Sequence, residues 1–422
     1  MRLTRPSSLR AALGASAAIA FAAPLAAQAT TAAPADTLND PIGILVSRLN
    51  LESYKGAVKG LTQFGDRRQG TERNRKAVDW IEAQLKSYGC TNTERVTYDW
   101  QPRPPRAGGR GRGGRGADSA RARTHTVIGD GPANGQGGSR EFGVRTRVGV
   151  NTDSLAQPDP RIRALDTEPT TPGQRQEVYC TKVGATHPDE MYIVGGHMDG
   201  IGWGEAANDD GSGSALVMQL ARVFSSPDVK TDRSIRFVLW NNEESGLDGA
   251  KAYVAQREAL QGKEDPAGSG KYPEPKWLGM IQHDMMMWDH GMPRSDGTLS
   301  KEQRPEADVN IEFAQTAKMA EAAQKLAWQF KAANDKYATD YPAQVGPHMT
   351  NTDSDPFKDI VPAISLRENE RGAQIGAGWD PNWHQPTDVF TTYGDKDFRL
   401  GLNAAETTLA AVAELTGATI RK

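Results

Sequence analysis

Apolar runs of strand length recur along the chain, separated by stretches with the periodicity of helices. The runs are typical of buried or half-buried strands, and they occupy residues 96–100, 177–181, 191–194, 234–240, 277–281, 309–313 and 361–366. Helical patterns cover residues 37–66, 72–88, 213–224, 249–254, 317–332 and 399–415. This alternation predicts an α/β fold in which a mostly parallel central sheet is flanked by helices on both faces.

The first residues have the pattern of a secretory signal peptide. A basic segment that ends at Arg10 precedes an apolar run from residue 11 to residue 25, and Ala27-Gln28-Ala29 supplies a small-x-small cleavage site. A transmembrane anchor is the weaker interpretation, because the run is shorter than the roughly 20 apolar residues that a span needs. We therefore expect residues 1–29 to direct export to the periplasm or the medium, and we expect no membrane span.

Residues 102–176 interrupt the alternation of strand and helix patterns, which indicates one domain over residues 30–101 and 177–422. The stretch Arg110–Gly116 consists of arginine and glycine, and such composition cannot bury enough apolar area to offset the entropy of ordering. A flexible insertion is therefore expected. Arginine- and glycine-rich segments also bind nucleic acids, but this one follows an export signal and lacks interleaved aromatic residues, so no nucleic-acid partner is expected.

Charge and cysteine content add two constraints. The formal net charge of −3 over 422 residues gives no reason to expect a polyanionic partner. The chain has 2 cysteines, Cys90 and Cys180, which can form a disulfide in an exported protein. Two buried free thiols are the alternative. A bridge becomes possible if the strands near the two cysteines pair antiparallel.

Side chains that bind metals follow several of the predicted strands or lie in the loops beyond them. They are His197, Asp209, Glu244, Asp284 and His384. Because α/β sheets place their sites at the carboxyl ends of the strands, we expect these side chains to converge. Imidazoles and carboxylates without thiolates suit zinc or a similar divalent ion.

Five ligands are too many for one catalytic zinc that keeps an open position, but they suit two metals if one carboxylate bridges. Asp209 is the best bridge, because its glycine-rich loop can bring the carboxylate deep into a cleft. Asp199 lies two residues after His197 and could hold the second imidazole nitrogen. Glu243 directly precedes Glu244 and is placed to act as a general base. Each motif alone has an ordinary structural interpretation, and their combination favours a catalytic site.

Together these motifs resemble those of the exported co-catalytic zinc aminopeptidases and their glutamate-carboxypeptidase-like relatives. The resemblance runs from about Gly65 to the C-terminus, apart from residues 102–176. It rests on Gly70-Thr71 with Asn74-Arg75, His197-Met198-Asp199, Asn208–Gly213, Glu243–Gly246, the strand end at Asp284, and His384 with Asp388.

The resemblance implies a zinc-exopeptidase fold and a role for each matching residue. His197 and Asp284 are expected to bind one zinc ion, Glu244 and His384 the other. Asp209 is expected to bridge the two ions, Glu243 to be the base, and Asp199, Asp210 and Asp388 to support the ligands. In that family the peptide bond that matches Asp209-Asp210 is often cis.

The chain departs from the family pattern at two positions. Many members have Ser-Asp-His where this chain has Thr352-Asp353-Ser354, so a polar group near the pocket has changed around Asp353. Many aminopeptidases have a tyrosine before the last ligand, whereas this chain has Trp383, which can offer only an indole N–H to an oxyanion. A tryptophan there also resembles the glutaminyl cyclases, which are single-zinc acyltransferases of the same fold but usually lack the Asp-Asp-Gly-Ser-Gly run.

We therefore expect a zinc-dependent exopeptidase with two zinc ions per chain and a peptide substrate, most simply an aminopeptidase. A carboxypeptidase or dipeptidase and a glutaminyl cyclase are the enzymatic alternatives. A non-catalytic relative should have lost ligands, and all 5 are present. Side-chain specificity and oligomeric state are not predicted by these motifs.

Overall fold

The computed structural model describes residues 40–90, 92–102, 126–128, 145–148, 150–289, 309–349, 351–368 and 380–421. The predicted signal peptide at residues 1–29 and the stretch Arg110–Gly116 lie outside these residues.

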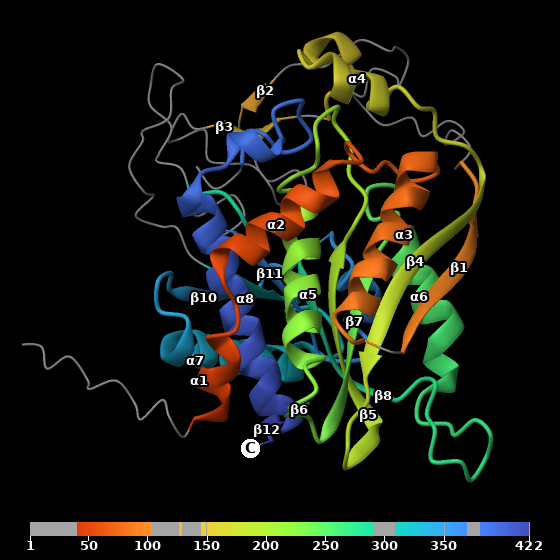
Figure 1. The fold of residues 1–422 in the computed structure, drawn as a ribbon, viewed down its shortest axis with the longest axis vertical. Coiled ribbons are helices and arrows are strands. Elements are labelled where there is room, and N and C mark those ends of the chain that lie inside the picture. The colour runs from red at the N-terminus through yellow and green to blue at the C-terminus, as the bar shows by residue number, and fades with distance from the viewer. Residues whose placement is uncertain are drawn as a thin grey trace, which may run out of the picture.

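An eight-stranded sheet is the centre of the described part of the chain (Figure 1). Its strands, in spatial order, are β1 (Thr93–Trp100), β4 (Gly173–Lys182), β7 (Arg233–Trp240), β5 (His187–His197), β8 (Lys276–His283), β11 (Ala363–Glu368), β9 (Val309–Phe313) and β10 (Ala343–Gly346). The central strands β7, β5, β8 and β11 are parallel to one another, whereas β4 pairs antiparallel with both β1 and β7, and β9 pairs antiparallel with β11. The predicted mostly parallel sheet is confirmed.

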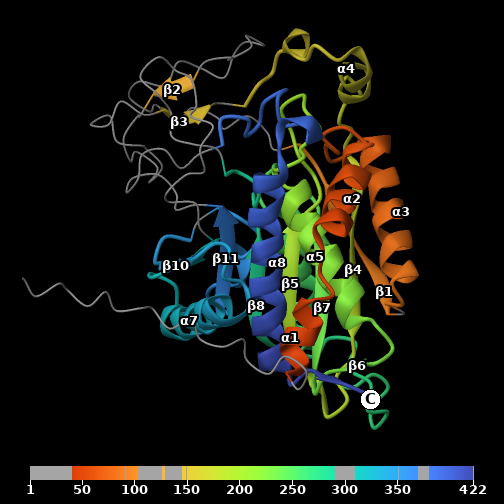
Figure 2. The same cartoon turned by 60° about the vertical axis from the view of Figure 1, so that its left-hand side comes forward.

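Helices cover both faces of the sheet, and Figure 2 shows the larger group of them on one face. One face packs against α1 (Pro41–Val46), α2 (Leu51–Thr62), α3 (Glu72–Ser87), α5 (Gly211–Phe224), α7 (Ala320–Tyr337) and α8 (Asp395–Thr416). The other face packs against α6 (Asp248–Arg257) and the 3-10 turn η4 (Asp355–Phe357). Successive strand residues point to opposite faces, which is why Val178 and Cys180 join the first core and Tyr179 joins the second.

Helix α5 leads directly away from the strand that carries His197. All of its residues except Arg222 are buried, because it lies between the sheet, α2 and α8. Asp210 caps it, because its side chain accepts a hydrogen bond from the Gly213 N–H. The cap places Asp209 and Asp210 at the carboxyl end of β5.

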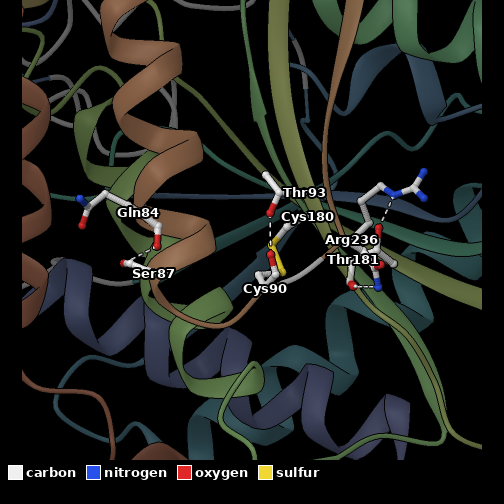
Figure 3. Close-up of a disulfide and its surroundings, with 8 residues drawn as sticks. Gln84, Ser87, Cys90, Thr93, Cys180, Thr181 and Arg236 are labelled. Atoms are coloured by element: carbon white, nitrogen blue, oxygen red, sulfur yellow. Dashed lines mark hydrogen bonds between the residues drawn. A yellow bond between two sulfur atoms is a disulfide. The ribbon is translucent and has the colours of Figure 1, made fainter.

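Cys90 and Cys180 form a disulfide (Figure 3). Cys90 follows α3, and the antiparallel register of β1 and β4 sets Thr93 opposite Cys180. The Thr93 hydroxyl donates a hydrogen bond of 2.6 Å to the Cys90 carbonyl, which holds the turn that brings the two sulfur atoms together. The bridge therefore ties α3 to the second strand of the sheet.

The expectation of a flexible insertion up to residue 176 is wrong for the last part of that range. Residues 150–172 contain the 3-10 turn η2 (Ser154–Ala156) and the helix α4 (Pro160–Asp166), and β4 already begins at Gly173. Asp159 caps α4 and Pro160 stands at its first position, which is a standard helix start. Side-chain hydrogen bonds support this segment, because Asp153 accepts from the Leu155 N–H and Asp159 from the Arg161 N–H.

The remaining short elements are peripheral. Strands β2 (Thr126–Ile128) and β3 (Arg145–Val148) pair antiparallel, as do β6 (Val229–Lys230) and β12 (Thr419–Ile420). The 3-10 turns η3 (Glu258–Leu260) and η5 (Phe390–Thr392) follow α6 and precede α8. Among the described residues, no helix combines the length and apolar character needed to cross a bilayer.

Candidate metal centre

Three neighbouring parallel strands deliver acidic and imidazole side chains to one edge of the sheet. His197 is the last residue of β5, Glu243 and Glu244 follow β7, and Asp284 follows β8. His197, Glu243 and Asp284 each present a ligand atom within 4.8 Å of the others, and Asp209, Glu244 and His384 do the same. All five predicted ligands and the predicted base therefore come together.

Asp209 lies between the two histidines. Its Oδ1 is 3.3 Å from Nε2 of His197, and its Oδ2 is 2.9 Å from Nε2 of His384. Burial raises the pKa of Asp209, but the two imidazoles outweigh burial and hold this pKa well below its usual range. One carboxylate thus faces both groups, which is the arrangement that a bridging ligand requires.

The second group is held together by His384 and Glu244. Nε2 of His384 lies 2.9 Å from Glu244 Oε2. Burial lowers the pKa of His384, but Glu244 and Asp209 outweigh it and raise this pKa to about 10. Burial raises the pKa of Glu244 to about 7. The raised pKa of this buried imidazole shows that the carboxylates of Glu244 and Asp209 create a negative potential, which also favours the binding of a metal cation.

Asp284 uses its two oxygens differently. Oδ1 lies 3.8 Å from Nε2 of His197, and Oδ2 forms an ion pair of 2.7 Å with Arg367. Burial raises the pKa of Asp284, but Arg367 and His197 outweigh it and bring this pKa to about 2. Arg367 was not expected from the sequence, although it directly follows the predicted strand at residues 361–366, and the same strand-end rule applies to it.

His197 is oriented by a backbone group and not by the expected carboxylate. Its Nδ1 donates to the backbone carbonyl of Asp199 at 2.9 Å, whereas the Asp199 carboxylate lies 3.9 Å away. That carboxylate accepts a hydrogen bond of 3.1 Å from the backbone N–H of Glu243. Asp199 therefore supports both residues, through its carbonyl for His197 and through its side chain for Glu243.

Asp210 and Asp388 hold the backbone around Asp209. Asp210 accepts hydrogen bonds from the backbone N–H groups of His197, at 3.0 Å, and Met285, at 3.1 Å. Asp388 accepts from the N–H groups of Asn208 and Asp209 at 2.8 and 3.2 Å. The peptide bond between Asp209 and Asp210 is cis, as the resemblance implied.

Glu243 is buried, with 9% of its surface exposed. Burial raises its pKa well above the usual value, although His197 lowers it. Its carboxylate lies in the group that contains His197 and Asp284. A carboxylate in this position can either bind a metal or exchange a proton with a molecule bound there.

Trp383 and Asp353 both lie close to residues of the site: Trp383 directly precedes His384, and burial together with the Asp353 carboxylate raises the pKa of Glu243. The Trp383 ring stacks on the His384 imidazole, with 3.8 Å between the ring centroids. Asp353 is fully buried, and one of its oxygens accepts from the Gln282 amide at 3.3 Å. His283 directly precedes Asp284, but its ring nitrogens contact the Gly195 carbonyl and the Thr408 hydroxyl and do not face the site.

The donor set fits zinc. Each group combines one imidazole with two carboxylates among the described residues, and the Asp209 carboxylate reaches the histidines of both groups. Nitrogen and oxygen donors of this kind are those of catalytic zinc. The raised pKa values of His197 and His384 have the same origin, because excess carboxylate charge surrounds both imidazoles.

An open α/β sheet with two adjoining groups of metal-type ligands at its strand ends is the architecture of a metal-dependent hydrolase, a class that includes phosphatases, nucleases and aminopeptidases. Comparison with known proteins identifies which one: the sequence profile of peptidase family M28 matches residues 177–399. The chain belongs to peptidase family M28.

The chain is similar to both aminopeptidases and carboxypeptidases. It is 41% identical over 68 residues to aminopeptidase YwaD of Bacillus subtilis, covering 16% of this chain and 14% of that protein. It is 35% identical over 71 residues to carboxypeptidase Q of Xenopus laevis, covering 17% of this chain and 15% of that protein. The chain thus matches only about a seventh of the length of these curated relatives.

Solved structures show the same fold at low identity. The zinc aminopeptidase BSAP from Bacillus subtilis superposes with a TM-score of 0.56 at 15% identity, covering 88% of this chain and 96% of the other. Glutaminyl cyclase from Porphyromonas gingivalis superposes with a TM-score of 0.52 at 16% identity, covering 87% and 98%.

Proposed function

We propose that the protein is a zinc-dependent exopeptidase that removes N-terminal residues from peptides. The observation that carries the proposal is the position of Asp209, whose two oxygens face His197 and His384 in two adjoining ligand groups. Family membership and the similarity to YwaD support the aminopeptidase assignment.

The proposed metal centre holds two zinc ions. His197 and Asp284 would bind one, Glu244 and His384 the other, and Asp209 both. When bound, the ions acidify a water molecule and polarise the scissile carbonyl. Arg367 keeps one oxygen of Asp284 engaged at 2.7 Å, which leaves the other oxygen for the site.

Glu243 is the proposed general base. It takes a proton from the attacking water and delivers it to the leaving amine, so that one carboxylate serves both steps. Its burial favours this role, because a carboxylate whose charged form is disfavoured accepts a proton readily. Asp199 fixes the Glu243 backbone and thereby aims the side chain.

Glutaminyl cyclase activity is the second candidate. It is favoured by Trp383, which occupies the position before the last ligand and stacks on His384. The two candidates differ in chemistry, because a cyclase releases ammonia from N-terminal glutamine and cleaves no peptide bond.

A substrate panel tests the proposal. Purified protein, treated with chelator and reloaded with zinc, is assayed on aminoacyl anilides, dipeptides, N-blocked peptides and peptides with N-terminal glutamine. Zinc-dependent release of free N-terminal residues, absent on N-blocked peptides, is the expected result. Release of C-terminal residues from N-blocked peptides would identify a carboxypeptidase and contradict the aminopeptidase assignment. Release of ammonia from peptides with N-terminal glutamine, without hydrolysis of any other substrate, would favour the cyclase.

We further propose that the protein is exported. The pattern of residues 1–29 and the disulfide between Cys90 and Cys180 support this. Sequencing of the mature protein from the exported fraction should find Thr30 at its N-terminus, and a precursor retained in the cytosol would contradict the proposal.

A further inference from the structure

The segment from Asn151 to Glu168 packs against the loop that carries His384. It contains η2 and α4, and α4 lies at one end of the molecule in both views (Figures 1 and 2). The segment precedes residues 177–399, the part of the chain that matches the family profile, whereas His384 lies inside that part. A part of the chain outside the family match therefore contacts a proposed metal ligand.

Two hydrogen bonds connect this segment to the His384 loop. The backbone N–H of Asn151 donates to the carbonyl of His384 at 3.0 Å. The side-chain amide of Gln157 donates to the carbonyl of Pro386 at 3.0 Å and to that of Trp203 at 2.6 Å. Gln157 is itself fixed, because its Oε1 accepts from the Asp159 N–H at 3.0 Å and only 2% of its surface is exposed.

The loops that Gln157 joins are in close contact with each other. A Cβ atom on Gly202 would lie 2.3 Å from the backbone carbon of His384, and Gly202 has a φ of +108°, so only glycine fits there. The Glu205 N–H donates to the Asp388 carbonyl at 2.7 Å. Gln157 thus lies across two packed loops and donates one hydrogen bond to each.

His384 needs external support more than His197 does. A histidine that binds a metal is usually oriented by a hydrogen bond from its second ring nitrogen, and Nδ1 of His197 makes that bond to Asp199. Nδ1 of His384 is buried and finds no hydrogen-bond partner among the described residues. His384 also has a φ of +56°, a left-handed conformation that a non-glycine residue keeps only where its surroundings enforce it.

We propose that Gln157 is a positioning residue for His384, and that the segment from Asn151 to Glu168 is an added part of the metal centre. The inference rests on the proposed two-zinc site. From outside the family match, Asn151 holds the His384 carbonyl directly, and Gln157 holds the same loop two residues further on, at Pro386. These two bonds take the place of the missing hydrogen bond on Nδ1. Gln157 touches neither substrate nor metal and acts only through the loop.

The test replaces Gln157 with glutamate, which keeps the shape and the acceptor oxygen but loses the amide donor. Leu155→Ala is the matched control, because Leu155 lies in the same segment and is 75% exposed. His384→Ala is the reference variant, because it removes a ligand from the group formed by Asp209, Glu244 and His384. Metal-free proteins are titrated with Zn²⁺ and, separately, with Co²⁺, whose visible absorption reports the geometry of each ion.

Gln157→Glu is expected to bind one ion as the wild type does and the other about 10–100-fold more weakly. After one equivalent of Co²⁺, the absorption spectrum of Gln157→Glu should equal that of His384→Ala. Leu155→Ala should match the wild type. Two wild-type binding steps in Gln157→Glu would overturn the inference. A wild-type protein that binds fewer than two ions would instead overturn the proposed metal centre.

Folding is checked by circular dichroism and thermal unfolding of the metal-free proteins. Gln157→Met, which also lacks the donor but carries no charge, is measured in parallel. If Gln157→Met folds and selectively loses one ion, the inference is supported, even if Gln157→Glu does not fold. If neither variant folds, Gln157 is needed for the fold itself, and the inference is overturned.

Discussion

Oδ2 of Asp209 lies 2.9 Å from Nε2 of His384, while the other oxygen of the same carboxylate faces His197 at 3.3 Å. This relationship makes Asp209 the one side chain expected to affect both ions. Asp209→Asn should therefore weaken the binding of both zinc ions, whereas Glu244→Gln should weaken only one.

Calorimetric titration of the metal-free variants measures this difference. Asp395→Asn, on a side chain that is 70% exposed, is the control and should bind both ions as the wild type does. Loss of a single ion in Asp209→Asn would show that Asp209 belongs to one group and does not bridge.

Metal affinity should rise with pH. In the metal-free protein the pKa of His384 is about 10 and that of Glu244 is about 7, both above their ordinary values. His384 is therefore protonated at pH 7, and Glu244 is protonated in about half of the molecules. A metal ion must displace these protons. For each proton that the metal displaces, the apparent metal affinity rises about tenfold for every unit by which the pH increases, as long as the pH is below the pKa of that group.

His384 alone therefore predicts about 100-fold tighter zinc binding at pH 9 than at pH 7. Competition with a chelator of known pH dependence measures the affinity, and titration in buffers of different ionisation heat counts the protons released. Affinity that is equal at the two pH values, without proton release, would contradict the protonated metal-free site.

Arg367 should protect the site against acid. The pKa of Asp284 is brought to about 2 chiefly by Arg367, so Arg367→Met should raise this pKa toward or above the ordinary value of about 4. Asp284 would then be protonated at a higher pH, and zinc should be lost at a higher pH than in the wild type.

Zinc content after equilibration between pH 4 and pH 7 measures the midpoint of metal loss. Arg399→Met, at an exposed position, should keep the wild-type midpoint. A midpoint in Arg367→Met that equals the wild-type value would show that the ion pair with Asp284 does not tune the ligand.

The strands and the residues that follow them were predictable because each depends on a local pattern. An apolar run identifies the end of β5, β7 or β8, and the carboxyl ends of parallel strands meet at one edge. That rule alone brings His197, Glu244 and Asp284 together, and it also applies to Arg367.

The supporting contacts were not predictable, because they join distant parts of the chain through single polar groups. Gln157 and Pro386 are 229 residues apart, and Gln157 lies in a proline-rich stretch whose composition suggested a flexible insertion. Asp199 was assigned to the correct neighbourhood but the wrong atom, since spacing does not reveal whether a carbonyl or a carboxylate faces an imidazole.

The role of Glu243 is the central claim, because Glu243 shares a group with His197 and Asp284 and could be either base or ligand. Glu243→Gln keeps the shape of the side chain but cannot take a proton from water. The decisive measurement is the zinc content of this variant together with its kcat. Two zinc ions per chain with kcat reduced by roughly 10²–10⁴-fold is the predicted result. Loss of zinc would make Glu243 a ligand, and full activity with both ions retained would contradict the proposed mechanism.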